Sequence, residues 1–234
     1  MSVILSVLIV VLSMLINFCL QLIPGTFALF YHYALGKTSA KKADDRSLSF
    51  IMGVEIFVTV IWLLAYFTVI AIFYNDNPII KSVFFYTLAG IFIIESIFSL
   101  FFYYRKGRST ALFIPRKVAA GISTHAKKAK NRSDCILLGA LSGFFELIFT
   151  LPLLFVCSSI LMNFDTTLRV ILITIYIILS ILPLFIIHAA FHSGRNLADI
   201  QRFRVKIKPL IRIILSFSFL TIALSAIYLG AING

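Results

Sequence analysis

The sequence predicts an all-α integral membrane protein with six transmembrane helices. Hydrophobic residues make up 61% of its 234 positions and the mean hydropathy is +1.04, which is more apolar surface than a water-soluble domain of this length can bury. Apolar segments of about 20 residues or more, the length of a span, recur along the chain. They cover roughly residues 3–33, 50–74, 79–104, 135–162, 168–190 and 210–231.

Basic residues gather in alternate loops, which predicts the orientation of the six spans. The loops after the first, third and fifth segments, at residues 36–48, 105–134 and 192–208, are rich in Lys and Arg, whereas the other two hold only Lys81 and Arg169. By the positive-inside rule we expect the three basic loops to be cytoplasmic and both termini to lie outside, in a multi-pass protein of the cell (inner) membrane. The net charge of +12 then reflects topology, and nucleic acid is not an expected partner.

The first apolar segment is expected to remain in the protein as a span. No basic region precedes it, and its apolar run is much longer than that of a signal peptide. No small-residue cleavage site separates it from Gln21. A cleaved signal peptide is therefore the weaker interpretation.

Polar and helix-breaking residues interrupt two of the segments, the first and the fourth. The first contains Gln21, Pro24, Gly25 and Thr26, and the fourth contains Glu146, Thr150 and Pro152. Proline removes a backbone donor and clashes with the preceding turn, so a break survives in lipid only where protein or a water-filled cavity satisfies the freed groups. Matching breaks in the two halves of a membrane protein place the expected binding site at the midplane between them.

The two breaks and the number of spans together predict a 3+3 inverted repeat. With three spans in each half, the second half must be upside down relative to the first. The expected repeats are residues 1–104 and 135–234, and a basic cytoplasmic linker, residues 105–134, joins them. This linker either lies on the membrane surface, where anionic headgroups attract Lys and Arg, or is a solvated connection that sets the topology.

Three glutamates, Glu55, Glu95 and Glu146, fall within apolar segments. A charged carboxylate near the bilayer centre costs at least about 2.5 to 3.5 kcal/mol, so each needs a proton, a partner or water. Glu146 stands just before the fourth-segment break, and Ser96 and Ser99 could share a helical face with Glu95. We expect these two glutamates to carry protons; the alternative is a carboxyl group that hydrogen-bonds a neighbouring helix.

The sequence does not indicate catalysis or a resident metal. It has no Gly-x-Ser-x-Gly motif, no phosphate-binding glycine loop and no His-Glu-x-x-His motif. His188 and His192 have the i, i+4 spacing of a metal-binding pair, but no local cysteine or carboxylate accompanies them, which favours anchoring of a helix at the interface. We therefore expect no enzyme activity, no cofactor and no metal.

Several of these segments resemble a known superfamily. The features are the stretch Gly139 to Leu147 with Thr150 and Pro152, the stretch Leu182-Pro183-Leu184-Phe185, the break Ile23-Pro24-Gly25, and the stretch Arg46 to Gly53. Together they resemble the six-helix membrane domains of the cytochrome c biogenesis and thiol-disulfide interchange proteins, which belong with the lysine exporters. The resemblance covers nearly the whole chain and implies a transport or electron-transfer function.

The cysteines depart from the redox members of that superfamily. Those members resemble one another in placing a cysteine beside the proline of the first and fourth helices, where this chain has Gly25 and Phe149. Cys19 and Cys157 lie on the same two segments but at different expected depths. Because a disulfide needs Cα atoms within about 7 Å, we do not expect them to pair.

Three functions of different classes follow from the sequence. The first is a secondary transporter, an exporter of a small solute such as an amino acid or a cation, coupled to protons. The second is a non-transporting membrane scaffold or lipid-associated subunit of a larger complex, and the third is a membrane thiol-disulfide electron carrier. The expected partners are the small molecule or ion and a bilayer with anionic headgroups, while a second copy of the chain or a membrane partner protein is left open.

Overall fold

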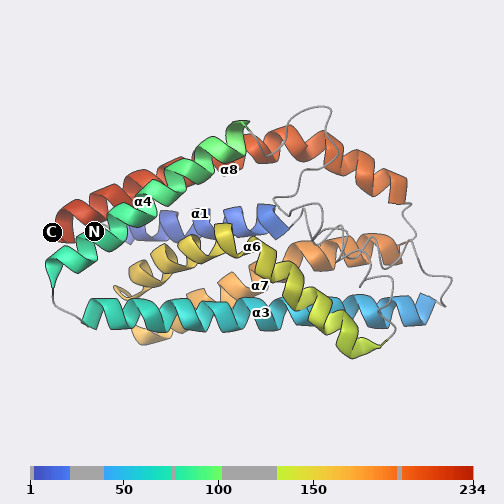
Figure 1. Ribbon diagram of the computed structural model, residues 1–234. Coiled ribbons are helices and arrows are strands. Elements are labelled where there is room, and N and C mark those ends of the chain that lie inside the picture. Colours follow the sequence, from blue (N-terminus) through green and yellow to red (C-terminus); the bar gives the residue numbers. More distant parts are fainter. Residues whose placement is uncertain (1–2, 22–39, 75–76, 102–130, 194–196, 234) are drawn as a thin grey trace.

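All regular structure in the described part of the chain is helical. The computed structural model describes residues 3–21, 40–74, 77–101, 131–193 and 197–233 (Figure 1). The helices are α1 (Val3–Gln21), α3 (Ala40–Tyr74), α4 (Pro78–Phe101), α6 (Arg132–Leu161), α7 (Thr166–His192) and α8 (Leu197–Asn233). The all-α class is confirmed.

Most of these helices can cross a membrane. Four of them, α3, α4, α7 and α8, contain apolar stretches long enough for a span, and α6 adds a fifth if its two bent halves are one span. The apolar part of α1, Leu5–Gln21, is shorter. The chain is thus a multi-pass helical membrane protein by the length and composition of its helices, while six spans and an inverted repeat stay predictions.

Two helices begin well before the apolar runs. α3 begins at Ala40 rather than at residue 50, and α8 begins at Leu197 rather than at residue 210. Parts of the basic segments 36–48 and 192–208 are therefore helical rather than loop. The physical reason is that these parts are rich in Ala, Lys and Arg, which are strong helix formers, whereas hydropathy marks only the portion of a helix that suits lipid.

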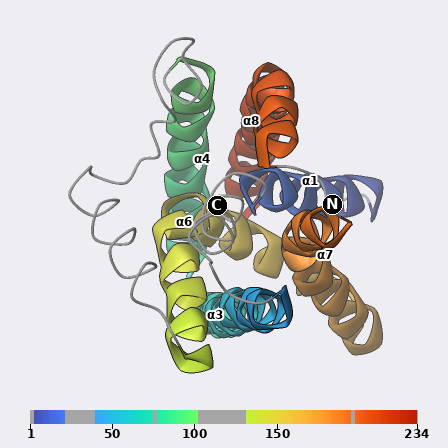
Figure 2. The same cartoon turned by 90° about the vertical axis from the view of Figure 1, so that its right-hand side faces the viewer.

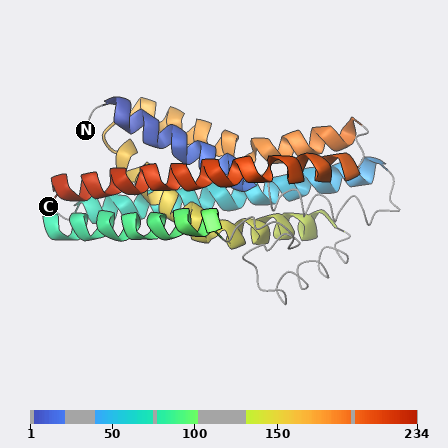
Figure 3. The ribbon, with the colours of Figure 1, turned by 90° about the horizontal axis from the view of Figure 1, so that it is seen from above.

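Both chain termini and the α3–α4 connection lie at one end of the bundle, called the terminal end below (Figures 1 and 3). In two of the connections between helices, a side chain caps the N-terminus of the helix that follows. Asn77 Oδ1 accepts a hydrogen bond from the Ile79 N–H at 3.0 Å, and Asp165 Oδ2 accepts one from the Leu168 N–H at 3.1 Å. These caps satisfy donors that the first turns of α4 and α7 leave free.

Two long helix pairs provide most of the packing. α3 packs along α6 and α4 packs along α8, while α1 contacts α6, α7 and α8. Figure 2, which looks along the bundle, shows α4 beside α8 and α1 beside α7. Helices from the two sequence halves therefore pack mainly on each other. The largest fully buried side chains include Trp62, Phe85, Phe92, Tyr176 and Phe219.

Glycines let α3 and α6 meet backbone to backbone. A Cβ atom on Gly139 would collide with the carbonyl oxygen of Phe50, and one on Gly53 would collide with a carbonyl oxygen of α6. Gly143, one turn further on, faces the ring of Phe57, which an added Cβ would meet at 2.6 Å. Small residues spaced by four positions are a recurrent means of close helix approach in membranes. We call Gly53, Gly139 and Gly143 the glycine contact.

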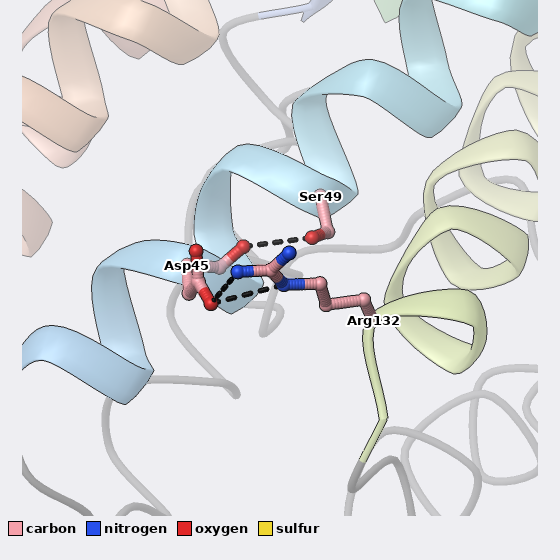
Figure 4. Close-up of polar contacts among 3 residues, drawn as sticks. All are labelled: Asp45, Ser49 and Arg132. Atoms are coloured by element: carbon pink, nitrogen blue, oxygen red, sulfur yellow. Dashed lines mark hydrogen bonds and ion pairs between the residues drawn. The ribbon is translucent and has the colours of Figure 1, made fainter.

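An ion pair joins the same two helices beyond the glycine contact. The guanidinium of Arg132, at the start of α6, donates from Nε and Nη2 to Oδ2 of Asp45, near the start of α3 (Figure 4). Ser49 Oγ donates to the carbonyl oxygen of Asp45 at 2.7 Å. Both charged side chains are well exposed, so the pair contributes about 0–1 kcal/mol. It fixes the alignment of the helix starts more than it stabilises the fold.

Gly139→Ala tests the glycine contact. The added methyl group forces α3 and α6 apart, and we expect the free energy of unfolding to fall by about 1–3 kcal/mol, the usual cost of overpacking. Gly90→Ala is the matched control, because its Cβ would meet nothing within 4 Å and alanine is favoured over glycine within a helix by about 1 kcal/mol. Unfolding of both variants in detergent measures the difference, and equal stability would contradict the close approach.

Candidate functional site

A cavity lies between α1, α3 and α6. Its free volume is about 10 Å³, roughly what one water molecule needs. It is lined by Asn17 and Gln21 of α1, by Phe57, Val58 and Ile61 of α3, and by Gly143, Thr150 and Leu154 of α6. Ligand pockets commonly measure about 300–1,000 Å³, so this space would have to widen before it could hold a solute.

The bend of α6 lies beside this cavity. The two halves of the helix, Arg132–Phe144 and Leu147–Leu161, meet at an angle of 72°. Pro152 follows in the second half, and because its ring clashes with the carbonyl group four residues earlier, it weakens the helix on the side of the bend. Gly143 on one side of the bend and Thr150 on the other both line the cavity.

α1 ends about halfway along the bundle, near the level of the α6 bend (Figures 1 and 3). Its last residue, Gln21, is buried and lines the cavity opposite Thr150 of α6. Pro24, Gly25 and Thr26, which the sequence predicts to interrupt this span, lie outside the described residues. The described end of α1 therefore reaches the cavity from one side while the bent helix α6 reaches it from another.

Asn17 supplies a polar group to the cavity that is only half satisfied. Its Nδ2 donates a hydrogen bond to Ser180 Oγ of α7 at 2.5 Å, and Ser180 Oγ donates in turn to the carbonyl oxygen of Tyr176 at 2.8 Å. Asn17 Oδ1 is buried and has no hydrogen-bond partner among the described residues. Leaving such an acceptor unpaired costs about 1–3 kcal/mol.

Glu95 is buried elsewhere and is not among the side chains that line the cavity. It is 4% exposed, and neither carboxyl oxygen has a hydrogen-bond partner within the described ranges. Its neighbour Ser96 instead donates to the carbonyl oxygen of Ser216 on α8 at 2.9 Å, so the expected polar face serves the α4–α8 contact. A charged carboxylate in such surroundings is costly.

The expected site residues that the structure describes thus fall into three groups. Gln21 and Thr150 share the cavity, whereas Glu95 does not line it. Glu146 belongs to α6 at the bend, with its side chain outside the described part, and Pro152 is buried in the same helix. Asn17 and Ser180 were not among the expected residues, although Asn17 stands four positions before Gln21 and therefore on the same helical face.

The three cysteines lie in the interior of the bundle, and His188 and His192 contact α3. Cys19, Cys135 and Cys157 are buried, and none of them forms a disulfide bond. His188 Nδ1 lies 2.8 Å from Ser47 Oγ, and His192 Nδ1 lies 3.4 Å from a carboxylate oxygen at the start of α3. These contacts join the last turns of α7 to the first turns of α3. Within the described ranges no three His, Cys, Asp or Glu side chains are grouped to hold a metal ion.

Ser180→Ala tests the hydrogen bond between α1 and α7. The substitution leaves Asn17 Nδ2 without its acceptor, and we expect a loss of about 1 kcal/mol in the free energy of unfolding. Ser225→Ala is the control, because that hydroxyl group bonds only the carbonyl of Thr221 in its own helix, and its effect should stay within about 0.5 kcal/mol. Chemical unfolding in detergent measures both; no difference between the variants would argue against the link.

Comparison of the chain with known proteins returns no relative. No family model matches it, and neither a curated protein nor a solved structure matches it. The resemblance to the cytochrome c biogenesis proteins and lysine exporters therefore stays a prediction from the sequence. The functional argument depends on the geometry of the cavity and of the helices around it.

Proposed function

We propose that the chain is a secondary transporter that exports a small solute, an amino acid or a cation, coupled to protons. The observation that carries the proposal is the cavity between the end of α1 and the bend of α6. Secondary transporters commonly bind their solutes near the bilayer midplane, between interrupted helices of two related halves. Of the three helices that line the cavity, α1 and α3 come from the first half of the sequence and α6 from the second.

An inverted repeat would relate α1 to α6, α3 to α7 and α4 to α8. The pattern of helix contacts supports this relation: α3–α6 corresponds to α1–α7, α1–α8 corresponds to α4–α6, and all four pairs are in contact. The contacts α1–α6, α3–α7 and α4–α8 each join a helix to its own counterpart, as a two-fold relation requires. The extents of the contacts are unequal, since α3 packs on α6 much more extensively than α1 packs on α7.

The proposed orientation places the terminal end outside the cell. The helices at the opposite end lead into the basic segments of the chain, which the positive-inside rule assigns to the cytoplasm. Alternate helix directions along the bundle are compatible with this topology (Figure 1). Anionic headgroups of the inner leaflet would then face the Lys and Arg side chains.

In the proposed mechanism the solute and the proton bind at different places. Asn17, Gln21 and Thr150 surround the closed cavity, and we place the solute there once movement at the α6 bend has widened it. Glu95, buried without a partner for its carboxyl group in the described part, suits the proton. Glu146, at the bend itself, is the second proposed proton carrier. Movement of the α6 bend would expose the cavity to each side in turn.

Transport into vesicles with an imposed pH gradient tests the proposal, with a panel of amino acids and cations as solutes. We expect Glu95→Gln and Glu146→Gln to abolish the dependence of transport on the gradient, because an amide cannot carry the proton. Glu55→Gln is the matched control, since that side chain is partly exposed on α3 and lines no described cavity; it should transport as the parent does.

Two results would refute the proposal. If both glutamine variants respond to the pH gradient as the parent does, the assigned proton carriers are wrong. If the parent moves no member of the panel and a pull-down recovers a stoichiometric membrane partner, the chain is a scaffold subunit.

A further inference from the structure

The helices divide into two groups, each of which packs far more on itself than on the other. α4 packs extensively along α8 but touches α3 and α6 only slightly, and Figure 1 shows α4 and α8 side by side along one side of the bundle. We call them the α4–α8 pair. The four-helix group consists of α1, α3, α6 and α7: α3 packs on α6 and α7, and α1 packs on the same two helices. α1 also borders α8.

Two hydrogen bonds fix the register of the α4–α8 pair. Ser82 Oγ donates to the carbonyl oxygen of Gly230 at 2.9 Å, and Ser96 Oγ donates to the carbonyl oxygen of Ser216 at 2.9 Å. The donors and the acceptors are each four turns of helix apart, about 21 Å. Because sliding of α4 along α8 would break both bonds, the pair behaves as one body.

Polar side chains also tie the four-helix group together. The hydrogen bond from Asn17 to Ser180 joins α1 to α7, and the ion pair of Figure 4 joins α3 to α6. The guanidinium of Arg169 on α7 donates to the Tyr66 hydroxyl group of α3 at 2.8 Å and to the carbonyl oxygen of Leu161, at the end of α6, at 3.1 Å. One side chain thus links α3, α6 and α7.

Aromatic rings meet where the pair lies against the four-helix group. The ring pairs are Phe73–Phe85, Phe84–Phe155 and Phe149–Phe219, with centroid distances of 5.9, 5.9 and 6.4 Å. Lys81 of α4 also lies over the ring of Phe73, beside the α3–α4 connection. Ring contacts persist over centroid distances from about 4.5 to 7 Å, and lipid chains can replace an apolar contact at little cost. Separation is therefore easier here than within either group.

The second half of α6 stands between the cavity and the α4–α8 pair. Thr150 and Leu154 line the cavity, while Phe149 and Phe155 contact the pair from the opposite side of the helix. The glycine contact fixes the first half of α6 to α3, and Arg169 holds the far end of the second half. The part that can move is therefore the part nearest the bend, which carries Thr150.

We propose that the α4–α8 pair moves as one body against the four-helix group, separating from it at the aromatic contacts, and that this movement opens the cavity. As the pair withdraws, Phe149 and Phe155 lose the rings that they pack against, and the second half of α6 turns at the bend. Thr150 and Leu154 then move away from Gln21, and the cavity widens. The role of this movement in transport rests on the proposed function, whereas the movement itself rests on the packing and the bonds described above.

Distances between pairs of spin labels test the movement. In a background with alanine in place of the three cysteines, labels are attached at the lipid-facing positions Leu64→Cys on α3, Ile94→Cys on α4 and Phe217→Cys on α8, where the native side chains are 57%, 65% and 65% exposed. Electron–electron double resonance in lipid vesicles measures the distances. We expect the distribution between positions 64 and 94, which crosses the interface, to be about twofold broader than that between positions 94 and 217 within the pair. Equal widths would overturn the inference.

Reaction of a cysteine at position 150 tests the link to the cavity. The reagent 2-aminoethyl methanethiosulfonate is larger than the closed cavity, so Thr150→Cys reacts only while the cavity is widened. Phe155→Ala removes a ring contact between α6 and the pair, and we expect it to accelerate the reaction about fivefold. Tyr86→Ala is the matched control, because it removes a ring that packs on Gly230 inside the pair, and it should change the rate by less than about twofold.

An unchanged rate in Phe155→Ala, or an equal increase in the control, would overturn the link between the movement and the cavity. If Phe155→Ala does not fold, the label distances decide, since they need substitutions only at lipid-facing positions. Neither experiment requires solute flux. A protein that shows both effects but transports no solute would refute the proposed function and leave the movement standing, whereas a transporter with equal widths would refute the movement alone.

Discussion

The rest of the structure depends on the backbone contact between α3 and α6. Because Gly53 and Gly139 have no side chains, the first half of α6 lies directly against α3, and the ion pair shown in Figure 4 fixes the starts of both helices. The second half of α6 then turns by 72°, and a helix that turns away cannot fill the space beside a long neighbour. The cavity lies at this turn, bounded by Gly143, by Thr150 and by the end of α1.

Polar groups inside the bundle determine which helices pair with each other, which apolar packing alone does not do. Lipid tails are as apolar as leucine side chains, so helices in a bilayer gain little from burying hydrophobic surface against each other, and hydrogen bonds between helices select their partners. The bond from Asn17 to Ser180 joins α1 to α7, and the bond from Ser96 to Ser216 joins α4 to α8. Asn17 Oδ1 and the Glu95 carboxyl group are left without a hydrogen-bond partner among the described residues.

Much of the fold was predictable because apolar runs mark lipid-facing helices, and Pro152 marked α6 as the interrupted one. The spacing of Gly139 and Gly143 is also typical of close helix packing in membranes. The helical extensions at Ala40 and Leu197 were missed because hydropathy does not detect polar helix. Ser180 could not be assigned, since a serine in an apolar helix usually bonds its own backbone, and only the tertiary fold brings it to Asn17.

The most direct test of the account is a cross-link between the two interrupted helices. Gln21→Cys and Thr150→Cys, combined in a protein without its native cysteines, should join through a short bis-thiol reagent in native membranes, because both positions line one cavity. The pair Ser96→Cys and Ser216→Cys, whose hydroxyl oxygens lie 3.0 Å apart, is the positive control. A cross-link at both pairs is the predicted result. A cross-link at the control pair alone would mean that the end of α1 and the bend of α6 do not share a cavity.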